Sequence, residues 1–207
     1  MLQIILFLMA QSVDKNIRTK ILKIKRGSLL FPEDFSKLGS SEAVRLVLHR
    51  LEKEKIITRI AQGIYVRPKI SQYIGEVLPS AEEVALGIAK RDRVKIVPTG
   101  VYALNALGLS TQVPMNLVYL TDGAPRVIKI GKRTIKFKKT TPKNLLAKGE
   151  ISSLVLQALR EIGIDKITID EEKMIIELLK KEKKSNLIHD ITLAPVWIQK
   201  IMKKADQ

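Results

Sequence analysis

The sequence contains no cysteine and few histidines, and it has no apolar run long enough to cross a bilayer. Without cysteine, disulfides, thiolate nucleophiles and cysteine-ligated zinc are all excluded. Histidine occurs only at His49 and His189, which excludes a metal site built from several histidines. The apolar opening, residues 1–9, is too short for a membrane anchor and lacks the basic start of a signal peptide. We therefore expect a cytoplasmic protein with no metal or cofactor. Because Met9 directly precedes the polar stretch that opens the first amphipathic segment, we expect natural translation to begin there.

Acidic residues are scarce relative to basic ones. The chain has 21 Asp and Glu against 37 Lys and Arg, a formal net charge of +16. Residues 1–75 hold 14 basic and 6 acidic side chains, residues 76–150 hold 13 and 6, and residues 151–207 hold 10 and 9. A phosphate backbone favours such clustering because each neutralised phosphate releases condensed counterions. Nucleic acid is the first candidate partner, and a merely soluble basic surface is the alternative.

Recognisable catalytic motifs are also missing, since no P-loop, HExxH or GxSxG occurs. Residues 98–100 (Pro-Thr-Gly) can offer amides to an anion and Asp122 can act as a ligand or base, but tight turns explain both more simply. Glu82 and Glu83 favour a helix dipole, and the adjacent residues 189–190 (His-Asp) cannot alone form a triad. We expect a protein that is not an enzyme. A nuclease or nucleotidyltransferase, the enzymatic alternative, needs clustered carboxylates for metal.

The N-terminal third predicts three helices followed by a hairpin. Apolar residues at helical spacing predict a helix over residues 12–24 that ends near Gly27. Residues 31–35 predict a short helix closed by Gly39, and residues 40–42 (Ser-Ser-Glu) supply N-cap chemistry for a longer helix to about Lys53. Two β-branched runs around residues 61–63 predict a hairpin. This order is that of a winged helix-turn-helix, which we place at residues 10–70.

The third helix is the predicted DNA-reading element. At about 100° per residue, Val44, Val47, Leu48 and Leu51 share one side, so the opposite side is free to face a groove. There Arg45 can donate two hydrogen bonds to a guanine edge, and the hairpin adds cations near its tip. The candidate DNA-binding residues are Ser41, Glu42, Arg45, His49, Arg50, Lys53, Lys55, Arg59 and Gln62. An ordinary solvated face, or a protein-interaction module, is the alternative.

Residues 67–79 predict a linker, with prolines near both ends, and residues 76–207 a second, mixed domain. There we expect strands at 94–97 and 117–120, a hairpin of 127–130 with 134–137, and helices over 80–91, 102–107, 152–163, 170–184 and 195–203. The predicted fold class is therefore α+β, a winged helix-turn-helix followed by a mixed α/β domain. The hairpin carries a second basic surface, made of Lys129, Lys132, Arg133, Lys136 and Lys138.

Several motifs carry a family likeness. Residues 39–44 (GSSEAV) and 48–51 (LHRL), together with Arg59, Gly63, Tyr65 and Pro68, resemble the winged-helix half of AbiEi-family antitoxins, in particular the DUF6088-type group. Residues 97–100, 103–105, 107–114 (LGLSTQVP) and 119–123 (YLTDG), with the basic hairpin at 126–139, are similar to the second domain of that group. The likeness spans about residues 9–162, and the LGLSTQVP and YLTDG blocks are its most specific parts.

The resemblance implies a non-catalytic antitoxin. Such proteins bind inverted repeats in their own promoter, repress the operon and counter a nucleotidyltransferase-fold toxin, commonly without a stable complex, which is the type IV arrangement. It implies double-stranded operator DNA and a toxin of that kind as partners. A winged-helix regulator that senses a small ligand in its second domain is the alternative, and it predicts a concave apolar pocket with converging polar groups.

Overall fold

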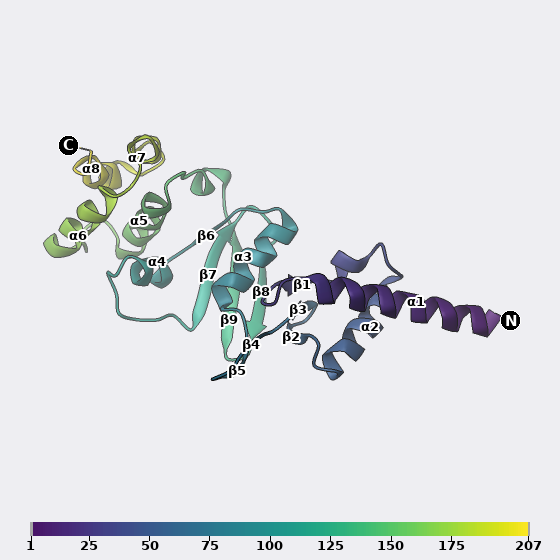
Figure 1. Ribbon diagram of the computed structural model, residues 1–207. Helices are drawn as coiled ribbons and strands as arrows, with labels where there is room; N and C mark the ends of the chain where they lie inside the picture. The colour runs from purple at the N-terminus through teal and green to yellow at the C-terminus, as the bar shows by residue number, and fades with distance from the viewer. Residues whose placement is uncertain (1, 207) are drawn as a thin grey trace. The chain divides into compact units, whose positions relative to one another are not determined.

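The computed structural model describes the backbone of residues 2–206 and the side chains of residues 13–206, so the expected start at Met9 lies outside the described side chains. The fold is mixed α+β, and the chain divides into two compact units, Met1–Val84 and Ala85–Gln207 (Figure 1). In the part described, no helix combines the length and apolarity needed to traverse a bilayer.

The N-terminal unit begins with the predicted helical elements. Ser40 caps α2, since its hydroxyl accepts a hydrogen bond from the Ala43 amide at 3.3 Å. The sheet is antiparallel in the order β1-β3-β2, so the predicted hairpin gains a third strand from the segment between the first two helices. The elements are α1 (Leu2–Lys23), β1 (Leu29–Leu30), the 3₁₀ helix η1 (Pro32–Phe35), α2 (Ser41–Lys53), β2 (Thr58–Ala61) and β3 (Ile64–Val66).

One apolar core holds this unit together. The predicted inner side of α2 is buried: Val44, Val47, Leu48 and Leu51 are at most 3% exposed. They pack with Ile17 and Ile21 of α1, Phe35, Ile57 and Tyr65. Arg18 of α1 adds a bidentate ion pair to Glu54, with Nη1 2.7 Å from Oε2 and Nη2 2.9 Å from Oε1. Since its inner side is fully used by the core, α2 can meet a partner only through its outer side.

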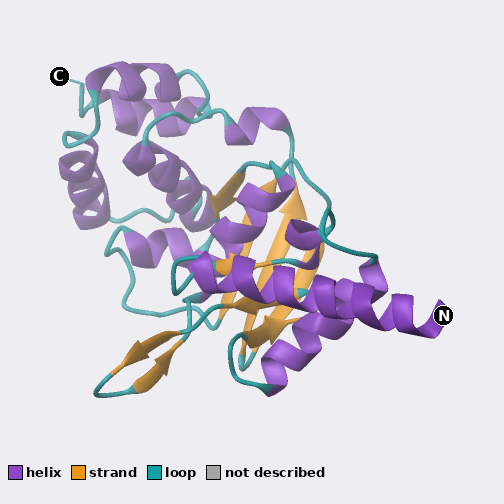
Figure 2. Ribbon diagram, turned by 45° about the vertical axis from the view of Figure 1, so that its right-hand side comes forward, coloured by secondary structure: helices purple, strands orange, loops and turns teal. Residues whose placement is uncertain are grey.

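The predicted linker at residues 67–79 is not a plain connection. It contains a second hairpin of β4 (Lys69–Ser71) and β5 (Gly75–Val77), which lies within the N-terminal unit. Gly75 has φ +72°, a conformation that favours glycine. The expectation of a linker was wrong because the prolines and glycine that predicted it also flank and form a hairpin. In Figure 2 this hairpin is the separate pair of orange arrows at the lower left.

The second unit is built on a four-stranded sheet. Its strand order is β6-β7-β9-β8, with β7 parallel to β9 and the other pairs antiparallel. The two-residue turn predicted at Gly131 and Lys132 is present, and Gly131 has φ +56°. Helix α3 (Ala81–Asp92) precedes the sheet. The other elements to this point are β6 (Ile96–Pro98), α4 (Val101–Ala106), β7 (Asn116–Thr121), β8 (Arg126–Ile130) and β9 (Arg133–Lys139).

Helices follow the sheet: η2 (Pro142–Leu145), α5 (Glu150–Ile162), α6 (Ile169–Leu179), α7 (Lys184–Ile191) and α8 (Val196–Lys203). Their buried side chains form a second core around Val155, Leu159, Ile175 and Ile198. The single helix predicted over residues 170–184 was wrong, because the chain turns after Leu179 and starts α7 at Lys184. Thr168 caps α6 in a capping box with Glu171, so the helix begins at Ile169, one residue before the expected start.

Candidate functional site

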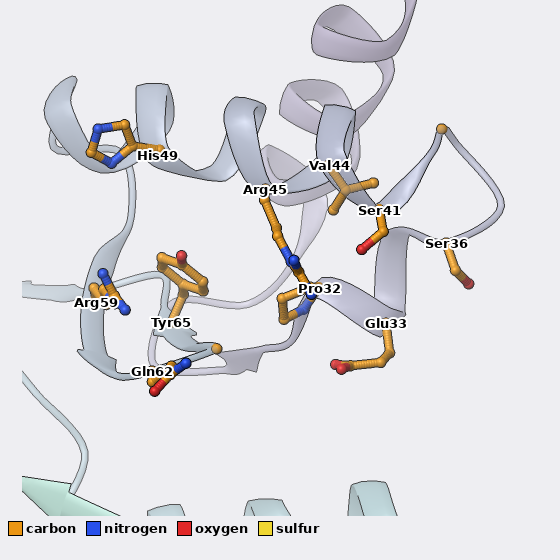
Figure 3. Close-up of a pocket in the computed structure, with 12 residues that line it drawn as sticks. Pro32, Glu33, Ser36, Ser41, Val44, Arg45, His49, Arg59, Gln62 and Tyr65 are labelled. Atoms are coloured by element: carbon orange, nitrogen blue, oxygen red, sulfur yellow. The ribbon is translucent and has the colours of Figure 1, made fainter.

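An open hollow of about 670 Å³ lies on the N-terminal unit, between α2, η1 and the turn from β2 to β3. Figure 3 shows its lining residues. Arg45 extends from α2 into the hollow toward Pro32, and Tyr65 points up from β3 toward α2. The lining residues are Pro32, Glu33, Ser36, Gly39, Ser41, Val44, Arg45, His49, Arg59, Gln62, Gly63 and Tyr65.

Five of the predicted DNA-binding residues meet in this hollow. Ser41, Arg45 and His49 come from α2, while Arg59 and Gln62 come from β2 and the turn that follows it. The lining therefore carries two arginines and one histidine against a single carboxylate, that of Glu33. Such a surface suits an anionic partner that offers hydrogen-bond acceptors along an edge.

The other predicted DNA-binding residues do not line the hollow. Arg50 is an ion-pair partner of α1, with Nη1 3.4 Å from Oδ2 of Asp14. Lys53 and Lys55 are exposed near the C-terminal end of α2. The backbone amide of Glu42 itself and then the Ser40 hydroxyl hold the pKa of the Glu42 carboxyl below its ordinary value. Glu42 thus places a carboxylate in the first turn of α2, where it opposes the approach of phosphate.

Sequence reasoning missed the part of the hollow that comes from η1. Pro32, Glu33 and Ser36 were assigned only to a short helix, and Tyr65 only to a strand. The packing of Phe35 into the core beside α2 turns the polar side of η1 toward Arg45. A period-three pattern in four residues is too short to reveal that side from the sequence.

The second basic surface is divided between two sides of a ribbon. In β9, Lys136 and Lys138 alternate with the buried Ile135 and Phe137, so both lysines lie on the exposed face. Lys129 pairs with Thr134 and so shares that face. Lys132 lies in the turn, and Arg133 lies on the opposite face, in phase with Ile135. Three of the five predicted cations therefore form one patch.

The small motifs of the second unit have structural roles. The Asp122 carboxylate accepts a hydrogen bond from the Lys95 amide at 2.9 Å, which closes the loop after β7. A carboxylate of the chain already lies at the Pro-Thr-Gly turn, because a Cβ on Gly100 would be 3.2 Å from Oε2 of Glu161. Among the described residues, no three His, Asp or Glu side chains lie close enough together to hold a metal ion.

The adjacent His189 and Asp190 belong to a buried network with Ser152. The Ser152 hydroxyl donates to Oδ2 of Asp190 at 2.5 Å, and Nδ1 of His189 lies 2.7 Å from Oδ1. In a hydrolytic triad the histidine, not the aspartate, takes the serine proton, so this order does not activate Ser152. Burial opposes ionisation of Asp190, yet the hydrogen bonds from Ser152, His189 and two backbone amides hold its pKa below the ordinary value. Asp190 is a carboxylate that fixes the segment just before α5, through the amides of Lys148 and Gly149, whereas Glu182 accepts the amides of Ile151 and Ser152 in the first turn of α5.

The comparisons with known proteins identify the family. The model of a family of unknown function, DUF6088, matches residues 16–187. This chain is a member of DUF6088. Among solved structures it is similar to the RV2827C protein from Mycobacterium tuberculosis, at 11% identity and a TM-score of 0.45, over 95% of this chain and 81% of that one. No curated protein matches the sequence.

The DUF6088 match contains the whole hollow and the basic ribbon, since both lie within residues 16–187. It also continues through α6 and into α7, beyond the end near residue 162 expected from the motifs. Asp190 and α8 follow the match, so one of the two carboxylates that hold the start of α5 comes from outside the matched segment, while the other, Glu182, lies inside it.

Proposed function

We propose that this DUF6088 chain is a DNA-binding autorepressor and the antitoxin of an AbiE-like type IV toxin-antitoxin system. In this proposal the N-terminal unit is a winged helix-turn-helix, with α2 as the recognition helix and the β2–β3 hairpin as the wing. The second unit counters a toxin of the nucleotidyltransferase type. The operator is double-stranded DNA with inverted repeats.

The hollow on the N-terminal unit is the observation that supports DNA binding most strongly. Its basic side chains come from two elements, Arg45 and His49 from α2 and Arg59 from β2, around one open surface. A recognition helix must keep one side in its own core and present the other to the groove. Helix α2 meets the first condition, since Val44, Val47, Leu48 and Leu51 on its inner side are buried, and Arg45 is placed to donate two hydrogen bonds to a base edge.

The antitoxin part rests on the resemblance and on family membership. The LGLSTQVP and YLTDG blocks lie at residues 107–114 and 119–123, and the DUF6088 match covers both. The patch of Lys129, Lys136 and Lys138 offers this unit a basic surface for phosphate or for the toxin.

DNA binding is tested on the full-length protein with a labelled duplex taken from upstream of its own gene, by fluorescence anisotropy at moderate salt. We expect Arg45→Ala to weaken binding by about 10-fold or more, because one bidentate contact discriminates by about 1–3 kcal/mol. Lys166→Ala removes another exposed cation, from the second unit, and should change binding less than about 2-fold. Unchanged binding by a folded Arg45→Ala protein would refute α2 as the reader.

The antitoxin role is tested through the neighbouring open reading frame. If that frame encodes a nucleotidyltransferase-like protein that arrests growth when expressed, co-expression of this chain should restore growth. Rescue by the Arg45→Ala variant would show that protection is separate from repression. A toxic neighbour that this chain fails to counter would refute the antitoxin role.

A second candidate, a regulator that responds to a small ligand, is favoured by one cavity of the second unit. It has a volume of about 230 Å³ and is lined by apolar Val94, Ala124 and Phe137 with polar Asp92, Thr121 and Arg126, beside Gly123. The Nε atom of Arg126 is buried without a hydrogen-bond partner within the described part of the chain. Under this proposal Arg126→Leu abolishes the response of a promoter reporter to its inducer and leaves basal repression intact.

A further inference from the structure

The β4–β5 hairpin extends from the N-terminal unit without joining its three-stranded sheet. Figure 2 shows it as a separate ribbon, apart from the helices of that unit. Lys69 pairs with Val77, Ile70 with Glu76 and Ser71 with Gly75, so residues 72–74 form the tip. A lone two-stranded hairpin is only marginally stable in water. Contacts at its base must therefore hold it in place.

Those contacts tie the base of the hairpin to α1 and β2. The Arg67 guanidinium donates to the carbonyl of Leu22, in the last turn of α1, at 2.8 Å and to that of Ile24, just after the helix. The Gly27 amide donates to the Arg67 carbonyl at 2.6 Å. The Thr58 hydroxyl donates to the Glu76 carboxylate. These contacts fix the direction of the hairpin and leave its tip free.

The tip presents apolar side chains to solvent. Tyr73 is 94% exposed and Ile74 is 75% exposed, and Ile70 on β4 is 62% exposed. Side chains this exposed bury little apolar area, so the fold gains little from their being apolar. A tyrosine and an isoleucine at the end of an anchored ribbon are suited to insertion into a partner.

The charges around the base indicate what kind of partner this is. Lys23, Lys25, Arg26 and Lys69 are exposed there, and none has a carboxylate partner among the described residues. The Lys69 side chain lies against Gly27, where a Cβ would be 2.4 Å from its Cε atom. A second copy of a chain with a net charge of +16 would bring like charges to this base, whereas a polyanion would neutralise them. The observations favour nucleic acid.

We propose that the β4–β5 hairpin is a second DNA contact, an arm that inserts Tyr73 and Ile74 between base pairs from the minor groove. Apolar wedges of this kind unstack a base step and kink the duplex. Lys25 and Lys69 contact the flanking phosphates and add affinity that does not depend on sequence. This inference rests on the DNA binding proposed above, and it adds a contact separate from the hollow.

The test compares full-length variants on the same promoter duplex, with 2-aminopurine placed in turn at its adenines to report unstacking. The double variant Tyr73→Ser with Ile74→Ser should bind about 10-fold more weakly and lose the 2-aminopurine signal, with the salt dependence of binding unchanged. Lys69→Gln should lower the slope of log affinity against log salt by about 1, because one phosphate contact is lost. Ile169→Ser is the matched control, since Ile169 is 74% exposed in the second unit.

The outcomes separate the arm from the proposed function. If the double variant binds and unstacks the duplex as the wild type does, while Arg45→Ala does not bind, the arm is refuted and the proposed function stands. If the wild type binds no duplex at all, both are refuted. A double variant that only dissociates a wild-type dimer in sedimentation, or only loses binding to phosphatidylserine vesicles, assigns the tip to another partner and overturns the arm.

Discussion

Replacing Asp190 by asparagine tests how the second unit is held together. The Asp190 carboxylate is fully buried, and four polar groups lie within hydrogen-bond distance of its oxygens. The Lys148 amide donates at 2.9 Å, the Gly149 amide at 2.8 Å and the Ser152 hydroxyl at 2.5 Å, while Nδ1 of His189 lies at 2.7 Å. The side chain thus joins α7 to the start of α5, across 38 residues or more of sequence.

The size of the effect follows from these four contacts. Asparagine keeps one acceptor oxygen and turns its NH₂ group toward one of the two backbone amides, whichever way it is placed. That amide then loses its partner, at a cost of about 1–3 kcal/mol. The remaining contacts change from charge-assisted to neutral, which costs about 1 kcal/mol each. We expect Asp190→Asn to lower the free energy of unfolding by about 3–5 kcal/mol, and Tm by on the order of 10 °C.

Urea unfolding, monitored by tryptophan fluorescence, measures this loss of stability in the second unit. Trp197 is the single tryptophan of the chain and packs against the α5–α8 core. Asp165→Asn is the control, because Asp165 is exposed and makes no hydrogen bond within the part of the chain that the structure describes. A loss below about 1 kcal/mol for Asp190→Asn, or an equal loss for the control, would refute the reasoning.

The difference in stability between the wild type and Asp190→Asn should also depend on pH. The pKa of Asp190 is lowered in the folded state, although burial alone would raise it, because its hydrogen bonds stabilise the charged form. Its contribution to stability is therefore complete above the unfolded pKa, about 3.9, and is lost as the pH falls through the lower folded value. The difference between wild type and Asp190→Asn should shrink as the pH falls below about 3.9. A difference that grows there contradicts the assignment.

Two further predictions concern α2. Ser40→Ala removes the cap of the Ala43 amide and should cost about 1 kcal/mol in urea unfolding, while Ser40→Gly should cost only a few tenths. Leu48→Ala should destabilise the N-terminal unit by about 2–5 kcal/mol because Leu48 is fully buried, whereas Leu46→Ala, at a side chain 52% exposed, should stay within about 0.5 kcal/mol in thermal unfolding. Equal effects of the two leucine variants would contradict the assignment of the inner side of α2.

The sequence predicted best where the structure depends on local pattern. The inner side of α2 follows from apolar spacing over thirteen residues, and the burial of Val44, Val47, Leu48 and Leu51 confirms it. Gly131 and Lys132 predicted the β8–β9 turn because a two-residue turn with positive φ favours glycine. Arg45, His49, Arg59 and Gln62 lie together because the hairpin follows α2 directly and packs beside it.

Prediction failed where a distant residue decides the local structure. The helix expected to begin at residue 152 begins instead at Glu150, after the N-cap Gly149, and the Ser152 hydroxyl bonds to Asp190, 38 residues away. The lysine-rich residues 180–184 favour a continuous helix by propensity. The chain turns there instead, because the Glu182 carboxylate accepts the amides of Ile151 and Ser152 at the start of α5. Spacing along the chain carries no trace of such partners.

The strand order of the second unit has a consequence during synthesis. β9 is the last strand made, yet it lies between β7 and β8, so the sheet cannot close before Lys139 has left the ribosome. The β1-β3-β2 sheet is complete at Val66, and its unit can fold while translation continues. Until β9 arrives, β7 exposes an unpaired edge that other nascent chains can join. We expect truncations that end between residues 122 and 132 to aggregate through β7, and those that end at Val84 to remain folded.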